Sequence, residues 1–229
     1  MISIEGRQGK YHVTLESFRG ELECYTVISP DSSMEKMVTT DYGRKSLAGD
    51  PRLLDMAVGV NPGKEYKVWD DWTRNYIRPG LRSQVFVNRI KKDKLGFQRR
   101  KIVIKQPLDS IEGRDSTALE QLEVLEAIRS LGFLVVPALL ATLNTNRLVL
   151  DWYQGKHPFG REWDTFFTRY LDELNEQIDT MGSKVPINRP IGHVDAQPAN
   201  YFIGDPLNPD IRKHFVVLDP VCHSCLFQF

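Results

Sequence analysis

The sequence predicts an α+β fold. Short apolar runs, many rich in β-branched side chains, alternate with turn-forming residues along much of the chain. Two longer segments, residues 117–131 and 163–181, lack this pattern and are expected to be helices. The 229 residues are 41% hydrophobic and 10% aromatic, which is enough to form a sizeable core and excludes a wholly disordered chain.

The first third of the chain, residues 1–77, predicts structure but suggests no chemistry. Short apolar runs, such as the one within residues 25–30, alternate with clusters of Gly, Pro, Asp and Ser. No long helical period is visible. We therefore expect irregular α+β structure in this segment.

The pattern becomes more regular from Ser83 onward. Residues 84–90 and 101–105 predict two strands, and the charged turn between them predicts a hairpin with a solvated tip. Residues 117–131 predict an amphipathic helix, with Ser116 available as its N-cap and Gly132 as its stop. Its apolar positions follow a period close to that of an α-helix: Ala118, Leu119, Leu122, Leu125 and Ile128.

The second half of the chain predicts two more strand pairs around a second helix. Residues 133–143 and 147–151 predict strands joined by a turn at residues 144–146. Residues 163–181 predict a helix of mixed polarity. Residues 201–203 and 214–218 predict two short strands that flank a turn-rich segment.

Composition limits the classes of partner and compartment. The 30 basic residues balance the 30 acidic ones, so nucleic-acid binding driven by counterion release is disfavoured. No apolar run approaches the roughly 18 residues that span a bilayer, and the N-terminus lacks the layout of a secretory signal. Three cysteines, Cys24, Cys222 and Cys225, are too few for a disulfide framework. We expect a cytoplasmic chain without membrane or nucleic-acid partners.

The residues most suggestive of chemistry surround the predicted strand at residues 201–203. The segment from His193 to Asn200 contains Asp195 and precedes this strand, and Asp219 follows the next strand. Asp195 and Asn200 on a short loop can face one site, and Asp219 can face it from the other side. Asn and carboxylate oxygens suit Mg²⁺, while one carboxylate remains to take a hydroxyl proton. Phosphoryl transfer requires this division of roles.

Each residue has a simpler interpretation when it is taken alone. Asp195 could form an Asx turn or a helix cap, and Asn200 and Asp219 could be ordinary turn residues. His193 could be a hydrogen-bonded core histidine. For Trp152 and Tyr153, packing in the core is favoured over stacking on a nucleotide.

The order of these motifs resembles the protein-kinase-like superfamily, especially its aminoglycoside phosphotransferase branch. The ending from Leu218 to Val221 is also similar to the small serine/threonine kinases of podophages. The resemblance covers roughly residues 78–221. It implies a two-lobed fold with a nucleotide lobe and hinge at residues 78–155 and a reduced catalytic lobe at residues 156–229. Residues 1–77 are an additional N-terminal segment of unknown role.

The resemblance also implies residue roles. Asp195 is expected to be the catalytic base, positioned by His193, while Lys105 binds phosphate oxygens and pairs with Glu120 or Glu123. Asn200 and Asp219 are the expected Mg²⁺ ligands. The remaining nucleotide-binding positions fall in the covering loop and the hinge: Gly80, Ser83, Asp151, Trp152 and Tyr153.

The expected function is therefore that of a kinase. It would use ATP and Mg²⁺ to phosphorylate a hydroxyl group, and the small catalytic lobe favours a protein serine or threonine over a small molecule. The alternative is an inactive pseudokinase that serves as an interaction or structural module. The single glycine of the covering loop, and Gln121 at the usual place of the helix glutamate, favour that alternative.

Overall fold

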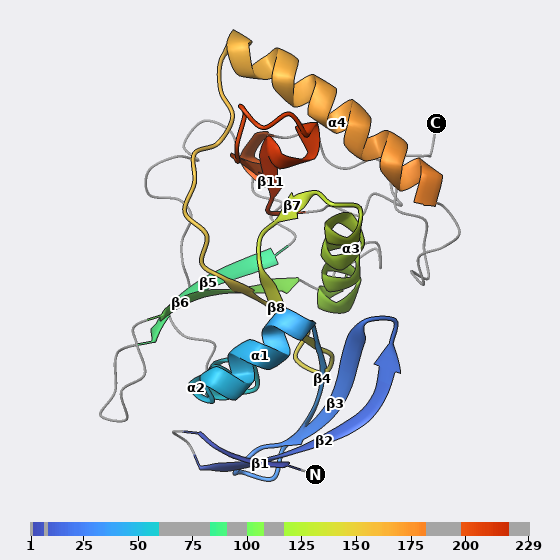
Figure 1. Cartoon of the computed structure of the whole chain (residues 1–229). Helices are drawn as coiled ribbons and strands as arrows, with labels where there is room; N and C mark the ends of the chain where they lie inside the picture. The colour runs from blue at the N-terminus through green and yellow to red at the C-terminus, as the bar shows by residue number, and fades with distance from the viewer. Residues whose placement is uncertain are drawn as a thin grey trace, which may run out of the picture. The chain divides into compact units, whose positions relative to one another are not determined.

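The computed structural model describes residues 2–6, 9–59, 83–90, 100–107, 117–181 and 198–219. These residues form a mixed α+β structure with a large antiparallel sheet and, in this described part, four α-helices (Figure 1). The chain divides into two compact units: Met1–Leu119 with Pro137–Trp152, and Glu120–Val136 with Tyr153–Phe229. The predicted α+β class is confirmed. Of the predicted boundaries, residue 77 lies outside the described residues, and residue 155 lies shortly after the unit boundary at Trp152.

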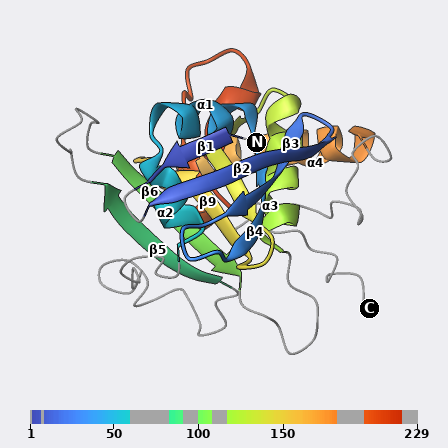
Figure 2. The same cartoon turned by 90° about the horizontal axis from the view of Figure 1, so that it is seen from below.

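The first unit is built on an eight-stranded sheet in which all neighbouring strands are antiparallel (Figure 2). Its strands, in spatial order, are β1 (Ile2–Glu5), β2 (Lys10–Arg19), β3 (Leu22–Ile28), β4 (Met34–Thr39), β8 (Ala138–Thr142), β9 (Arg147–Asp151), β6 (Arg100–Pro107) and β5 (Ser83–Ile90). The junction of β4 with β8 joins strands that are far apart in the sequence. The N-terminal segment therefore extends the same sheet that contains the predicted hairpin.

Two short helices, α1 (Asp41–Gly49) and α2 (Arg52–Ala57), pack in one hydrophobic core with the sheet. Thr40 caps α1, because its hydroxyl accepts a hydrogen bond from the Gly43 amide at 2.8 Å. Side chains of alternating strand positions reach this core, which includes Tyr11, Val13, Val27, Met37, Phe86, Ile102, Ile104 and Val149. One face of the sheet therefore packs against α1 and α2.

For residues 2–6 and 9–59 the expected α+β character of the N-terminal segment is confirmed, but the structure is regular and not irregular. This part contains four strands and two helices. The helices span only nine and six residues, too short to reveal a helical period. In β2, the alternation is broken by a bulge between Leu15 and Ser17, where the register with β3 shifts.

The second unit contains the rest of α3 (Ala118–Ser130), whose first two residues fall in the first unit. It also contains α4 (Arg161–Met181) and a three-stranded sheet. In this sheet β10 (Tyr201–Ile203) pairs antiparallel with β11 (Phe215–Val217), which pairs parallel with β7 (Leu134–Val135). Aromatic side chains of α4, including Phe167 and Tyr170, pack edge-on against Tyr201 and Phe215.

The remaining predicted elements are confirmed with one correction. Residues 133–143 form two strands, β7 and β8, rather than one, because Val136 and Pro137 separate them. Pro137 has no N–H to donate to a ladder. Its carbonyl accepts from the Asp151 amide in the first unit, whereas the Val136 amide donates to Val217 in the second. Across the described residues, none of the helices combines the length and apolarity needed to cross a membrane.

Candidate functional site

The two predicted Mg²⁺ ligands lie at the same end of the β10–β11 hairpin. Asn200 ends the short 3₁₀ helix η2 (Pro198–Asn200), directly before β10. Asp219 lies two residues after Val217, the last residue of β11. The ladder continues past the strands, because the Leu218 amide donates to the Asn200 carbonyl at 2.9 Å. Both side chains are half-buried. The antiparallel pairing therefore places Asn200 and Asp219 at the same end of the hairpin.

Three other predicted site residues, Gly80, His193 and Asp195, lie outside the described residues. Ser83 opens strand β5 opposite Pro107 of β6. The described part begins again at Pro198, so Asp195 precedes it by three residues in the sequence.

Lys105 lies on the face of the large sheet opposite α1 and α2. Its strand pairs it with Val85 on one side and Leu148 on the other. Its neighbours Ile104 and Ile102 are fully buried in the core formed with α1 and α2. Side chains alternate along a strand, so Lys105 and Lys101 project from the other face. The half-buried Lys105 is thus held by a central strand and not by the core that α1 and α2 complete.

Trp152 contacts Lys101, which lies on the same face of β6 as Lys105. The Lys101 ammonium lies 4.9 Å from the centre of the Trp152 ring, a cation–π contact, and the Trp152 amide donates to the Lys101 carbonyl. Trp152 is about one third exposed, at 37%. Packing had been favoured for this residue, and the structure shows a packed but accessible aromatic face. The spacing of Lys101 and Lys105 on β6 was a signal for this arrangement that the sequence reasoning missed.

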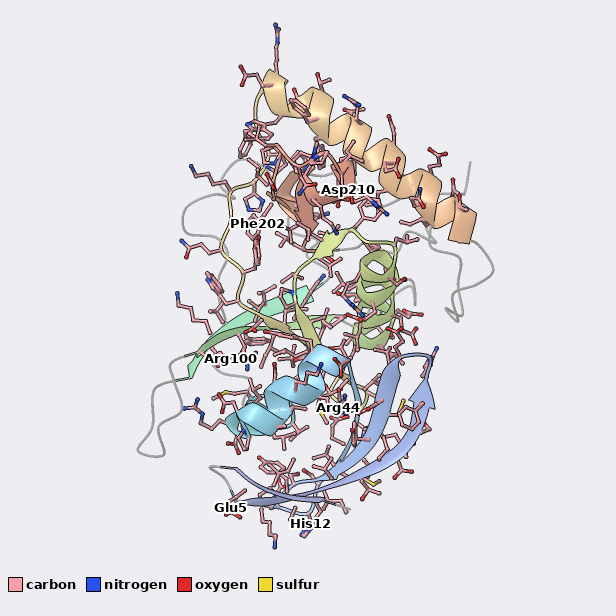
Figure 3. The ribbon with its side chains drawn as sticks, viewed as in Figure 1. Glu5, His12, Arg44, Arg100, Phe202 and Asp210 are labelled. Atoms are coloured by element: carbon pink, nitrogen blue, oxygen red, sulfur yellow. The ribbon has the colours of Figure 1, made fainter. Side chains whose placement is uncertain are left out.

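The Asp151 carboxylate lies on the face of the sheet opposite Lys105, where two side chains donate hydrogen bonds to it. Arg100, which is labelled in Figure 3, donates to it through Nε at 3.0 Å and Nη2 at 2.7 Å. The Tyr42 hydroxyl of α1 donates to it at 2.5 Å. Burial and the hydrogen bond to Asp151 raise the pKa of Tyr42. The Asp151 side chain therefore fastens α1 to the sheet, and any contact of Asp151 with a nucleotide would use its main chain.

Residues 152–160 link β9 to α4, and Tyr153 is the first residue of this linker that belongs to the second unit. Its ring stacks on Phe202 of β10, which is labelled in Figure 3, at a centroid distance of 5.8 Å. Close approach also requires Gly155, because a Cβ at this position would lie 2.6 Å from Cγ of Phe202. The Lys156 carbonyl accepts from the Ile203 amide at 2.7 Å. The linker is therefore fixed along β10, close in sequence to Asn200.

The two candidate glutamates of α3 differ in burial. Glu123 is 7% exposed, whereas Glu120 is half-buried. An ionised carboxylate is costly to bury without a cationic or hydrogen-bonding partner. Which of the two glutamates pairs with Lys105 stays a prediction. Gln121 is itself buried, at 4% exposure.

The hairpin end fits Mg²⁺ better than a softer metal. Among the described residues, no group of three or more His, Cys, Asp and Glu side chains could hold a metal. Asn200 and Asp219 offer hard oxygen donors, which suit Mg²⁺. This ion commonly takes only one or two protein carboxylates and completes its shell with phosphate oxygens and water. Asn200 and Asp219 could supply only part of such a shell, and a Mg²⁺ site here stays a prediction.

No family model matches the chain, and no curated protein matches it significantly. The functional proposal therefore rests on the residues and their arrangement.

Proposed function

We propose that this chain is an ATP-dependent phosphotransferase with a protein-kinase-like two-lobed fold. It would transfer the γ-phosphoryl group of MgATP to a hydroxyl group, with a protein serine or threonine as the favoured acceptor. The observation that carries the proposal is the placement of Asn200 and Asp219 at one end of the β10–β11 hairpin. This placement follows directly on the loop that contains His193 and Asp195.

The order of the elements supports the same proposal. A strand hairpin with Lys105 is followed by α3, by the strands β8 and β9, by an extended linker, by α4 and by the β10–β11 hairpin. This is the order that the resemblance to kinases implies. Strands β1–β4 and helices α1 and α2 are additions on the β8 side of the sheet and on the face opposite Lys105.

Each group has a distinct part in the proposed reaction. Asn200 and Asp219 would hold Mg²⁺, which neutralises charge on the phosphates when it is bound. Lys105 would contact phosphate oxygens, and the exposed face of Trp152 offers an apolar surface to the base. Asp195 would take the proton of the acceptor hydroxyl as its oxygen bonds to the γ-phosphorus. The bond from that phosphorus to the bridging oxygen breaks, and ADP leaves.

A thermal-shift titration with ATP, with and without Mg²⁺, tests the nucleotide site. A ligand that binds only the folded state must stabilise it, by about 2.7 kcal/mol at a hundredfold excess over Kd. We expect a Mg²⁺-dependent shift that is lost in Asp219→Asn and in Asn200→Ala. Asp205→Asn is the matched control, because Asp205 lies in the loop at the other end of the same hairpin. A wild-type protein that shows no shift would refute the site.

Transfer itself is tested with γ-labelled ATP and the variant Asp195→Ala. We expect this variant to keep the Mg²⁺-dependent shift and to lose phosphoryl transfer to the protein acceptor or to itself. Full activity in Asp195→Ala would exclude the proposed mechanism. Nucleotide binding without any transfer by the wild type would favour the pseudokinase alternative.

A further inference from the structure

The C-terminal end of α3 is held by two cations from the loop of the β10–β11 hairpin. Arg212 donates through Nη1 to the Leu131 carbonyl at 3.1 Å, and the Lys213 ammonium donates to the Gly132 carbonyl. Both residues belong to the 3₁₀ helix η3 (Ile211–Lys213). Carbonyl groups at a helix C-terminus lack intrahelical partners and carry the negative end of the helix dipole. Arg212 and Lys213 therefore donate hydrogen bonds to these carbonyl groups and place positive charge at the negative end of the dipole.

The Arg212 side chain is bound by Asp210 as well as by the end of α3. The Asp210 carboxylate accepts from Arg212 Nε at 2.8 Å and from Nη2 at 3.0 Å, and it also caps η3 through the Arg212 amide. This bidentate pair leaves Nη1 directed at Leu131. The hydrogen bonds from Arg212 lower the pKa of Asp210. The carboxylate therefore stays ionised and keeps the arginine fixed at neutral pH.

Gly132 completes the contact. Its φ of +89° lies in the left-handed region that favours glycine, and a Cβ there would lie 3.2 Å from Arg212 Nη1. Directly after this glycine the chain enters β7, which pairs with β11. The Val136 amide then donates to the Val217 carbonyl at 2.8 Å. Helix α3 is thus joined through both side chains and main chain to the hairpin that ends at Asp219.

The N-terminal end of α3 is held differently, within the first unit. The Ala118 amide donates to the Asn146 side chain at 2.8 Å, in the turn between β8 and β9. This contact is a neutral hydrogen bond, whereas the C-terminal contacts are charge-assisted and are supported by strand pairing. The two ends of α3 are therefore held by contacts of different kinds, and the C-terminal end lies in the second unit together with Glu123 and Asp219.

We propose that Arg212 and Lys213 are positioning residues for phosphoryl transfer. They fix α3, with its buried Glu123, to the hairpin that presents Asn200 and Asp219. This inference rests on the proposed function, since it explains how a helix carboxylate keeps a constant relation to the metal ligands. On this account α3 does not swing independently of the hairpin.

The test compares the double variant Arg212→Ala/Lys213→Ala with the wild type by hydrogen exchange and by steady-state kinetics. We expect amide exchange in the last two turns of α3 to rise about tenfold or more, because the end of the helix is released. We expect kcat to fall about tenfold while KM for MgATP changes by less than about threefold, because misplacement affects transfer more than binding. Arg169→Ala, at an exposed position of α4, is the control and should change neither quantity.

Single variants keep the test decisive if the double variant fails to fold. Lys213→Ala should produce the same changes to a smaller extent, and Lys213→Arg, which retains a cation, should restore them. Unchanged exchange in α3 would refute the attachment, whatever the activity. Faster exchange with an unchanged kcat would refute the positioning role. A wild type that neither binds nor uses MgATP would instead refute the proposed function, while the exchange measurement would still judge the attachment.

Discussion

At the residue scale, the two-residue period of β6 and β9 separates structural roles from proposed chemical roles. Asp151 pairs with Ile102, and its carboxylate binds Arg100 and Tyr42 on the face that packs with α1. Lys105 pairs with Leu148 and projects from the other face. The same strands can therefore anchor α1 and present a lysine without conflict.

Two glycines of α1 provide a matched pair for testing how closely this helix packs on the sheet. A Cβ at Gly43 would lie 1.7 Å from the Leu139 carbonyl oxygen, whereas a Cβ at Gly49 would meet no atom within 4 Å. Gly43→Ala must push the helix away from β8 and should destabilise the fold by about 3 kcal/mol or more. Gly49→Ala should be neutral or stabilise it by up to about 1 kcal/mol. Urea unfolding of both variants gives the comparison, and equal stabilities would contradict this packing.

Tyr25 on β3 should make stability fall at alkaline pH. Burial and a hydrogen bond to Glu23 raise its pKa from 10.0 to about 12 in the folded state. Because the folded state favours the neutral hydroxyl, this contribution is complete below pH 10 and is lost as the pH rises to about 12. Tyr25→Phe should remove this part of the pH dependence. The check is the free energy of unfolding from urea titrations across that range, and identical pH profiles for variant and wild type would contradict it.

At the element scale, local pairs were predictable and distant pairings were not. The β5–β6, β8–β9 and β10–β11 hairpins and both long helices follow from patterns within short windows. The pairing of β4 with β8 depends on contacts between distant residues, which no local pattern encodes. The split at Pro137 did have a local signal, because proline cannot donate to a strand ladder. The same limit applies to the site. The predicted hairpin places Asn200 and Asp219 at one end, whereas no local pattern predicts the hydrogen bond between Tyr42 and Asp151.

Glu35 of β4 organises the turn between β8 and β9, and its loss should weaken both the turn and the sheet. Its carboxylate accepts from the amides of Leu143 at 3.1 Å, Asn144 at 2.7 Å and Thr145 at 3.1 Å. Hydrogen bonds to a charged group contribute about 1.5–3 kcal/mol each. Glu35→Ala should lower the free energy of unfolding by about 3 kcal/mol, and Glu35→Gln by less, because an amide oxygen still accepts. Glu16→Ala, at an exposed position of β2, is the control in urea unfolding and should change little. A wild-type stability for Glu35→Ala would show that the turn forms without this carboxylate.

At the scale of the whole molecule, the N-terminal segment is part of the sheet that carries Lys105. Strand β4 pairs with β8 through Met37, Val38 and Thr39, and helices α1 and α2 share the core of that sheet. The role of residues 1–77, for which the sequence suggested no function, is at least in part to complete the first unit. Of the nucleotide lobe expected at residues 78–155, residues 78–119 and 137–152 belong to this larger first unit, whereas residues 120–136 and 153–155 belong to the second.

A chain restricted to residues 78–229 should consequently fail to fold. It would leave β8 as an edge with unpaired main-chain groups and would expose Ile102, Ile104 and Val149, which are fully buried in the intact chain. Exposing each of these side chains costs about 1.5–3 kcal/mol, and together they exceed the reserve of a typical small domain once the β4–β8 pairing is also lost. We expect no cooperative urea transition by circular dichroism and low solubility. Co-expression with residues 1–77 should restore both, because the missing strand and helices are then supplied in trans. A soluble 78–229 chain with a cooperative transition would instead show that residues 78–229 fold by themselves, with the N-terminal segment as a separable attachment.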